Sequence, residues 1–144
     1  MKKPVSPKGG IKKSTDLELK LKRVLADYQN QKKRFEREKI EFVKFASASI
    51  IDKLLSVLDD LERAGNHLKD EGLNLSINQF KSVLNSEAVE EIKLKGTIFD
   101  PQTADCAELV NGKKDHIIEI IKKGYTLNDK VLRPAQVKVG KGDK

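Results

Sequence analysis

The chain has 144 residues and a net charge of +7, and it is 38% hydrophobic and 35% charged, with no tryptophan. Such a composition is too poor in apolar residues for a large monomeric core and favours long helices joined to one small domain. The single cysteine excludes an intramolecular disulfide, and no apolar leader or run of about 18 apolar residues is present, so we expect a cytoplasmic protein without a membrane span.

Residues 1–15 are predicted to form a disordered basic tail. They include two prolines, two glycines and five lysines, and the lysines supply +5 of the net charge before the first acidic residue, Asp16. These lysines are Lys2, Lys3, Lys8, Lys12 and Lys13. Such a tail either keeps the protein in solution or tethers it to a nucleic acid or an acidic partner.

Residues 16–64 are predicted to form one long helix. They contain no proline or glycine and are dense in residues that lose little side-chain freedom in a helix. Ser14, Thr15 or Asp16 is expected to cap its start, and Gly65 is the first residue that favours an end. At about 1.5 Å per residue the helix would be about 75 Å long, too long to fold inside one globule of this size.

The apolar residues of this helix predict that it pairs with a second copy of the chain. As far as Phe45 they follow the 4-3 alternation of a two-stranded coiled coil, which the polar Gln31 and Glu38 interrupt. Beyond Phe45 they widen into the face of a bundle helix. The residues expected at the dimer interface are Leu17, Leu21, Val24, Tyr28, Phe35, Phe42, Leu54, Leu58 and Leu61. The alternative, a helix packed on the remainder of its own chain, leaves too few residues to cover it.

Two charged segments lie within the same helix. Residues 32–39 mix basic and acidic side chains at i,i+4 spacing, which fits either a solvated face or a basic stripe that contacts a protein partner. An acidic cluster follows at residues 52–62, where Asp59 and Glu62 are three residues apart. No histidine lies within a turn of this pair, so no metal site is expected.

A second, shorter helix is predicted after a connection at residues 65–72, with Asn74 or Ser76 as its cap and an apolar face that includes Ile77 and Phe80. Because a helix this short is marginal alone, we expect it to pack on the long helix. Residues 16–87 would then form the dimerisation module, and two copies would make a four-helix bundle.

Residues 88–140 are predicted to form a small β domain, which makes the fold class α+β, and residues 141–144 a frayed end. Strands are expected at residues 89–92, 108–110, 116–121 and 131–139, with a turn at 128–130. Asn111-Gly112 indicates a hairpin between the second and third strands. Pro134 places the last strand at a sheet edge or a bulge.

The sequence contains no catalytic constellation. His67 and His116 belong to different modules and have no nucleophile beside them, and Cys106 is expected to be a small buried residue. The glycine spacing of a phosphate-binding loop is absent. The residues alone therefore predict a protein-binding module that is not an enzyme and holds no metal or cofactor.

Residues 124–139 closely resemble the signature of the GrpE family, the nucleotide exchange factors of DnaK-type chaperones; they read GYTLNDKVLRPAQVKV. Residues 99–101 are similar to the upstream half of this signature, although Ala104 and Cys106 stand where the family usually has histidine and alanine. Residues 28–39, 54–64 and 71–73 are similar to the family's long-helix and bundle segments. The basic tail departs from the acidic tails typical of the family.

The resemblance implies a parallel homodimer in which one β domain docks on the nucleotide-binding domain of a DnaK-type chaperone, opens its cleft and accelerates ADP release. Arg133 would be an exposed charged contact. The partner-binding residues that the resemblance implies are Arg133, Pro134, Gly124, Asp129, Lys33, Lys44 and Phe45. The alternative is a coiled-coil adaptor or a nucleic-acid-binding protein that uses the basic tail, and of these partners a nucleic acid is the less expected.

Overall fold

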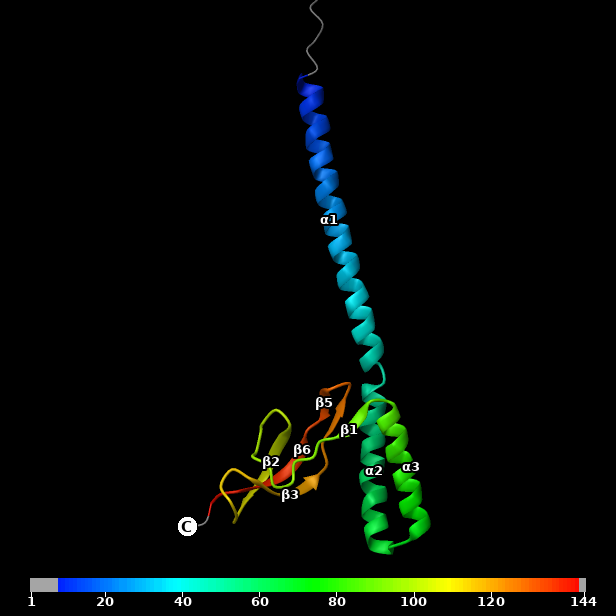
Figure 1. The fold of residues 1–144 in the computed structure, drawn as a ribbon, viewed down its shortest axis with the longest axis vertical. Coiled ribbons are helices and arrows are strands. Elements are labelled where there is room, and N and C mark those ends of the chain that lie inside the picture. The colour runs from blue at the N-terminus through cyan, green and yellow to red at the C-terminus, as the bar shows by residue number, and fades with distance from the viewer. Residues whose placement is uncertain (1–7, 143–144) are drawn as a thin grey trace, which may run out of the picture. The chain divides into compact units, whose positions relative to one another are not determined.

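The computed structural model describes residues 8–142. The chain divides into two compact units, residues 1–43 and 44–144, and each is described by itself. Helices precede a small set of strands, which confirms the α+β class (Figure 1). No helix among residues 8–142 combines the length and the apolar character needed to cross a bilayer.

Helix α1 extends over Lys8–Phe45 and begins earlier than predicted. Residues 8–15 of the predicted tail are therefore helical, and residues 1–7 lie outside the described part of the chain. Thr15 does not cap the helix, because its Oγ1 lies within the helix and donates to the Ile11 carbonyl at 2.8 Å. The two glycines of the predicted tail fall in the first turn, where few hydrogen bonds within the helix depend on them.

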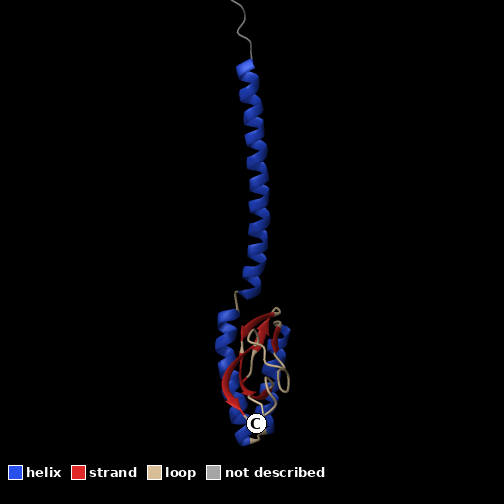
Figure 2. Cartoon of the chain, turned by 90° about the vertical axis from the view of Figure 1, so that its left-hand side faces the viewer, coloured by secondary structure: helices blue, strands red, loops and turns tan. Residues whose placement is uncertain are grey.

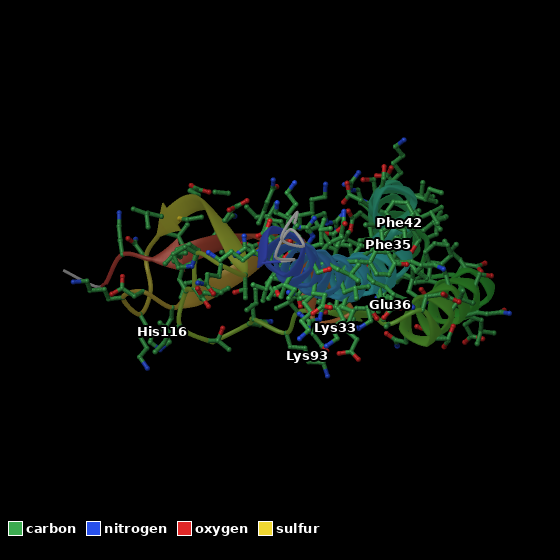
Figure 3. The ribbon with its side chains drawn as sticks, turned by 90° about the horizontal axis from the view of Figure 1, so that it is seen from above. Lys33, Phe35, Glu36, Phe42, Lys93 and His116 are labelled. Carbon is green, nitrogen blue, oxygen red and sulfur yellow. The ribbon has the colours of Figure 1, made fainter. Side chains whose placement is uncertain are left out.

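The predicted apolar stripe of α1 is uncovered within its own unit. Its six large members within α1 are between 58% and 73% exposed. They are Leu17, Leu21, Val24, Tyr28, Phe35 and Phe42. Figure 3, which looks along α1, shows Phe35 and Phe42 on one side of the helix and Lys33 on another. The stripe is therefore free to bind another apolar surface.

The predicted single helix is interrupted at Ala46 and Ser47, and α2 begins after this turn as Ala48–Leu68 (Figure 2). Neither residue breaks a helix by itself. Tertiary contacts decide the break, because Phe45 packs against the core of the second unit and the Lys44 carbonyl accepts a hydrogen bond from Asn128. The helix continues through Gly65. It ends at Lys69, whose backbone adopts the left-handed conformation common at helix C-termini.

Helix α3 extends over Glu71–Ser86 and packs along α2 (Figure 1). Its cap is Asp70, whose carboxylate accepts from the Leu73 amide at 2.8 Å, so Asn74 and Ser76 lie inside the helix and not at its start. The two helices share a core with the first β-sheet, and Leu58 is fully buried in it. Its own chain covers Leu58, which corrects the prediction that this residue lies at the dimer interface.

The first sheet, here called the inner sheet, packs on the α2–α3 pair. It consists of β1 (Val89–Glu91), β4 (Tyr125–Leu127) and β5 (Lys130–Arg133), in the antiparallel order β1-β4-β5. Val89, Tyr125 and Leu127 are buried against the helices. The predicted turn between β4 and β5 is present, with positive φ angles at Asn128 and Asp129, as a tight hairpin requires.

The second sheet, here called the outer sheet, has a core of its own. It consists of β2 (Ala104–Val110), β6 (Ala135–Gly140) and β3 (Ile117–Lys122), in the order β2-β6-β3. Strand β6 pairs in parallel with β2 and antiparallel with β3. In β6, the buried residues Ala135, Val137 and Val139 alternate with more exposed ones. This pattern fits the central place of β6 in the sheet.

Three sequence predictions about these strands are wrong. The predicted hairpin at Asn111-Gly112 does not pair β2 with β3, because β6 lies between them. The predicted single strand 131–139 is two strands in different sheets, β5 and β6, separated by Pro134. Cys106 on β2 is also exposed, against the expectation of a buried thiol.

Candidate partner-binding site

The structure brings three of the predicted partner-binding residues to one corner of the second unit. The Asn128 amide donates to the Lys44 carbonyl at 3.0 Å, and the Lys130 ammonium lies 4.6 Å from the centre of the Phe45 ring. Asp129 occupies the turn between Asn128 and Lys130. We call these five residues the hairpin corner. It joins the end of α1 to the tip of the β4–β5 hairpin.

The hairpin corner presents charges to solvent on a fixed support. Lys44, Asp129 and Lys130 are exposed, while Phe45 is half-buried against the core and is therefore not part of the helix-pairing stripe. The Lys130 ammonium is held at the turn by its cation–π contact, and Lys44 lies exposed at the end of α1. Two such cations suit an acidic protein surface. Lys130 was not among the residues predicted from the sequence, although its place directly after a two-residue turn puts it at a hairpin tip.

Arg133 is not at this corner and is not the exposed contact that the sequence predicted. It is only 8% exposed. Its guanidinium donates to both carboxylate oxygens of Asp59 on α2, at 2.8 and 3.0 Å, and to the Lys123 carbonyl from Nε at 3.1 Å and from Nη2 at 2.7 Å. The guanidinium also lies 5.5 Å from the centre of the Tyr125 ring. Arg133 therefore joins the strands to α2.

Gly124 and Pro134 lie beside Arg133, at the connections between the two sheets. Gly124 is buried, and a Cβ atom on it would lie 2.6 Å from the Ala135 amide nitrogen. Pro134 is half-buried and separates β5 from β6. Gly124 thus allows two backbone segments to approach closely, and Pro134 interrupts the strand between the two sheets, so both residues have a structural role here.

A second ion-pair cluster lies beside Arg133 on the same helix. Glu62 pairs with Lys81 on α3 and with Lys123 at 2.9 Å, and Lys123 also lies 3.6 Å from Glu91. Burial alone would raise the pKa of Glu62, but hydrogen bonds from the two lysines outweigh it and hold that pKa below the ordinary value of 4.5. Burial would lower the pKa of Lys123, and Glu62 raises it instead. Asp59 and Glu62 thus bind cationic side chains.

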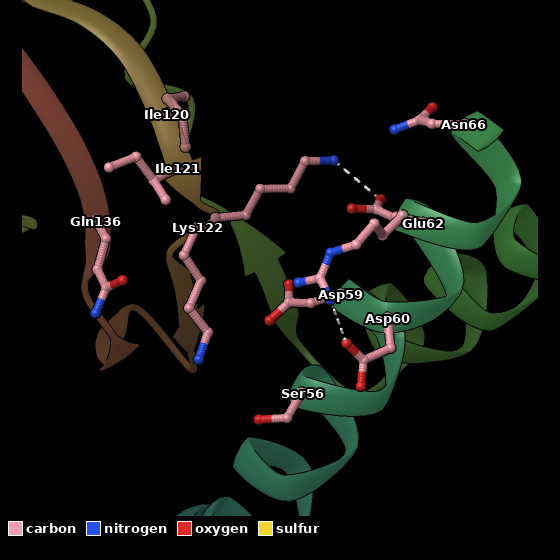
Figure 4. A pocket seen from close by; sticks show the side chains of 11 residues that line it. Ser56, Asp59, Asp60, Glu62, Asn66, Ile120, Ile121, Lys122 and Gln136 are labelled. Carbon is pink, nitrogen blue, oxygen red and sulfur yellow. Dashed lines mark hydrogen bonds and ion pairs between the residues drawn. The ribbon is translucent and has the colours of Figure 1, made fainter.

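A groove of about 560 Å³ opens between α2 and the outer sheet (Figure 4). Asp59, Asp60 and Glu62 line it from the helix, and Ile121 and Lys122 line it from the strand side. The Lys123–Glu62 ion pair spans its edge. The groove shows that the outer sheet is not packed directly on α2.

The exposed apolar face of α2 differs from the one predicted. Ile50, Leu54, Val57 and Leu68 are between 40% and 71% exposed and follow helical spacing along one side. Leu61 is half-buried beside the core. Ile50 and Val57 were not among the residues predicted at the dimer interface, because the buried face of α2 lies next to the exposed one and helical spacing does not separate the two faces. Lys33 is exposed on α1, in the other unit.

Comparison with known proteins identifies relatives along nearly the whole chain. The family model described as GrpE matches residues 10–141. Protein GrpE of Caldanaerobacter subterraneus subsp. tengcongensis is 43% identical over 127 residues, which are 83% of this chain and 62% of that protein. Protein GrpE of Methanosphaera stadtmanae is 41% identical over 85% of this chain and 75% of its own length. The chain thus spans less than two thirds of the first of these relatives.

Proposed function

This chain belongs to the GrpE family, and we propose that it acts as the nucleotide exchange factor of a DnaK-type chaperone. It binds the chaperone's nucleotide-binding domain, opens the nucleotide cleft and accelerates release of ADP. The observation that carries the proposal is the family match over residues 10–141, which includes nearly all of α1, the α2–α3 pair and both sheets.

The mechanism is differential affinity. An exchange factor accelerates ADP release only as far as it binds the open cleft better than the closed one. An acceleration of about a thousandfold, if it came wholly from that preference, needs about 4 kcal/mol. The factor itself supplies binding energy and performs no bond chemistry.

We place the docking contact at the hairpin corner. Lys44 and Lys130 are exposed there, and Val131 beside them is 40% exposed, so the corner offers both charge and apolar area to a partner. Arg133 is buried and is not part of this proposed contact.

The active form in this proposal is a homodimer. The apolar stripe of α1 and the exposed face of α2 with Ile50, Leu54 and Val57 are uncovered by their own units. Pairing of two chains would cover both and complete a four-helix bundle from two α2–α3 pairs.

Binding measurements with the cognate DnaK-type chaperone test this proposal. Labelled protein should bind nucleotide-free chaperone more tightly than ATP-loaded chaperone. Lys130→Glu should weaken binding about tenfold, because it reverses a charge at the proposed contact. Lys95→Glu, which makes the same change at an exposed turn elsewhere, should bind like the wild type. Equal affinity for both nucleotide states would overturn the proposal.

The charge distribution favours a second candidate, a nucleic-acid-binding or adaptor role for the N-terminal unit. Residues 1–43 hold 13 lysines and arginines against 6 acidic residues, whereas residues 44–144 hold 16 of each. Under this second reading, nucleic-acid binding would be tight and sequence-specific, and deletion of residues 1–13 would weaken it by removing the five lysines of the tail. Weak, salt-sensitive binding that the deletion abolishes would favour the exchange factor.

A further inference from the structure

Three chain connections between the inner and outer sheets meet at one point, which we call the crossover. One follows β1 at Ile92, one joins β3 to β4 at Lys123 and Gly124, and one joins β5 to β6 at Pro134. The Ile92 amide donates to the Gly124 carbonyl at 2.9 Å. Gly124 lies so close to Ala135 that no side chain fits between them. The outer sheet is therefore attached through a small, tightly packed area.

Arg133 ties this crossover together and fastens it to the helices. It binds the Lys123 carbonyl within the crossover through two hydrogen bonds, and it binds Asp59 on α2 through both carboxylate oxygens. Lys123 makes a second bond to α2 through Glu62. The two acids are three residues apart on the helix, so both anchors lie on one face within a single turn.

Apolar packing does not attach the outer sheet to the α2–α3 helices. The inner sheet shares its core with α2 and α3, whereas the outer sheet has a separate core. The groove of about 560 Å³ separates the outer sheet from α2 beside the crossover. A sheet attached at one narrow point, with open space beside it, can rotate unless directional bonds prevent it.

We propose that the Asp59–Arg133 pair is a positioning pair that fixes the orientation of the outer sheet on the α2–α3 helices. This inference rests on the proposed exchange function for its consequence: an outer sheet held at one angle can open the chaperone's cleft, and a loose one cannot. The planar guanidinium is needed because it binds a carboxylate and a carbonyl at once, which a lysine cannot reproduce.

The orientation itself is measured first, without the chaperone. Cys106, the only cysteine, is exposed on β2 of the outer sheet and accepts a spin label. A second label at His67→Cys on α2 reports the distance between the outer sheet and the helix, with labelled chain diluted in unlabelled chain. The distance distribution should be narrow in the wild type and in Asp60→Asn, and broad in Asp59→Asn. A narrow distribution in Asp59→Asn would overturn the proposal.

ADP release from the chaperone provides the second readout. Asp59→Asn and Arg133→Gln should each slow stimulated release about tenfold at saturating factor, and the double variant should be no slower than either single one. If Arg133→Gln does not fold, Arg133→Lys takes its place. Loss of release in Arg133→Gln with full release in Asp59→Asn would make Arg133 a direct contact and refute the positioning role. A wild-type protein without exchange activity would refute the exchange function. The spin-label distances alone would then test the positioning role of the Asp59–Arg133 pair.

Discussion

Arg133 on β5 and Asp59 on α2 form a two-pronged ion pair, with hydrogen bonds of 2.8 and 3.0 Å between residues that lie 74 positions apart in the sequence. Both side chains are nearly buried, at 10% and 16% exposure. The sequence suggested a surface charge that could be removed without effect on folding. The structure instead places Arg133 among the residues that hold the fold together.

Arg133→Ala should therefore destabilise the protein. Removal of one partner leaves the Asp59 carboxylate and the Lys123 carbonyl without their donor in a poorly hydrated place, at a cost of about 3 kcal/mol. Urea unfolding, followed by the circular dichroism of the second unit, measures the change. Lys95→Ala removes an exposed cation at a turn and should cost less than about 0.5 kcal/mol. Equal stability of both variants would contradict the buried pair.

Acidification should weaken the attachment at Glu62. Because the folded-state pKa of Glu62 lies below its ordinary value of 4.5, its contribution is fully present above about that pH and is lost as the pH falls through the lowered pKa. The difference in unfolding free energy between the wild type and Glu62→Gln should thus shrink below pH 4.5. Glu90→Gln, at an exposed residue, is the control. A difference that stays constant from pH 6 to pH 3 would refute this assignment.

Gly124→Ala should be destabilising although alanine is the smallest possible addition. The new methyl group would lie 2.6 Å from the Ala135 amide nitrogen, so backbone must move, at a cost of about 1–3 kcal/mol. Gly72→Ala on α3 meets only the Asp70 carboxylate, at 3.2 Å, and should be tolerated. Thermal unfolding of both variants makes the comparison. A midpoint for Gly124→Ala equal to that of the wild type would show that the crossover is loose.

The parts of the fold that depend on local signals were predictable from the sequence. The hairpin turn at Asn128 and Asp129 and the apolar stripe of α1 follow from turn chemistry and from helical spacing. The break after Phe45 was not predictable, because it depends on contacts with the distant β4–β5 hairpin. The Asn111-Gly112 signal failed for the same reason, since a strand from the end of the chain inserts between its neighbours.

In the candidate site, too, local features were predictable from the sequence and long-range contacts were not. Lys44, Phe45 and Asp129 were singled out from the sequence, and the structure brings them together. Arg133 was misjudged because its role depends on Asp59, and no pattern of spacing joins two residues so far apart. The acidic cluster at residues 52–62 could be read from the sequence, but the basic side chains that pair with it could not.

Self-association should depend on the apolar stripe of α1. Sedimentation equilibrium at micromolar concentration should give twice the chain mass of 16.2 kDa. Phe35→Ser should weaken the dimer, because it removes a large apolar side chain from the stripe. Ile40→Ser removes a similarly exposed apolar residue from another side of the helix and should leave the mass unchanged. A monomeric wild type would contradict the proposed architecture.

Stimulated release of ADP is the direct measure of the proposed exchange-factor function. The cognate DnaK-type chaperone is loaded with a fluorescent ADP analogue, mixed with this protein and chased with ATP. We expect release to accelerate by orders of magnitude and this protein alone to hydrolyse no nucleotide. Lys130→Glu should need more protein for the same effect, whereas Lys95→Glu should not. An unchanged rate of release at saturating wild-type protein would contradict the exchange-factor function.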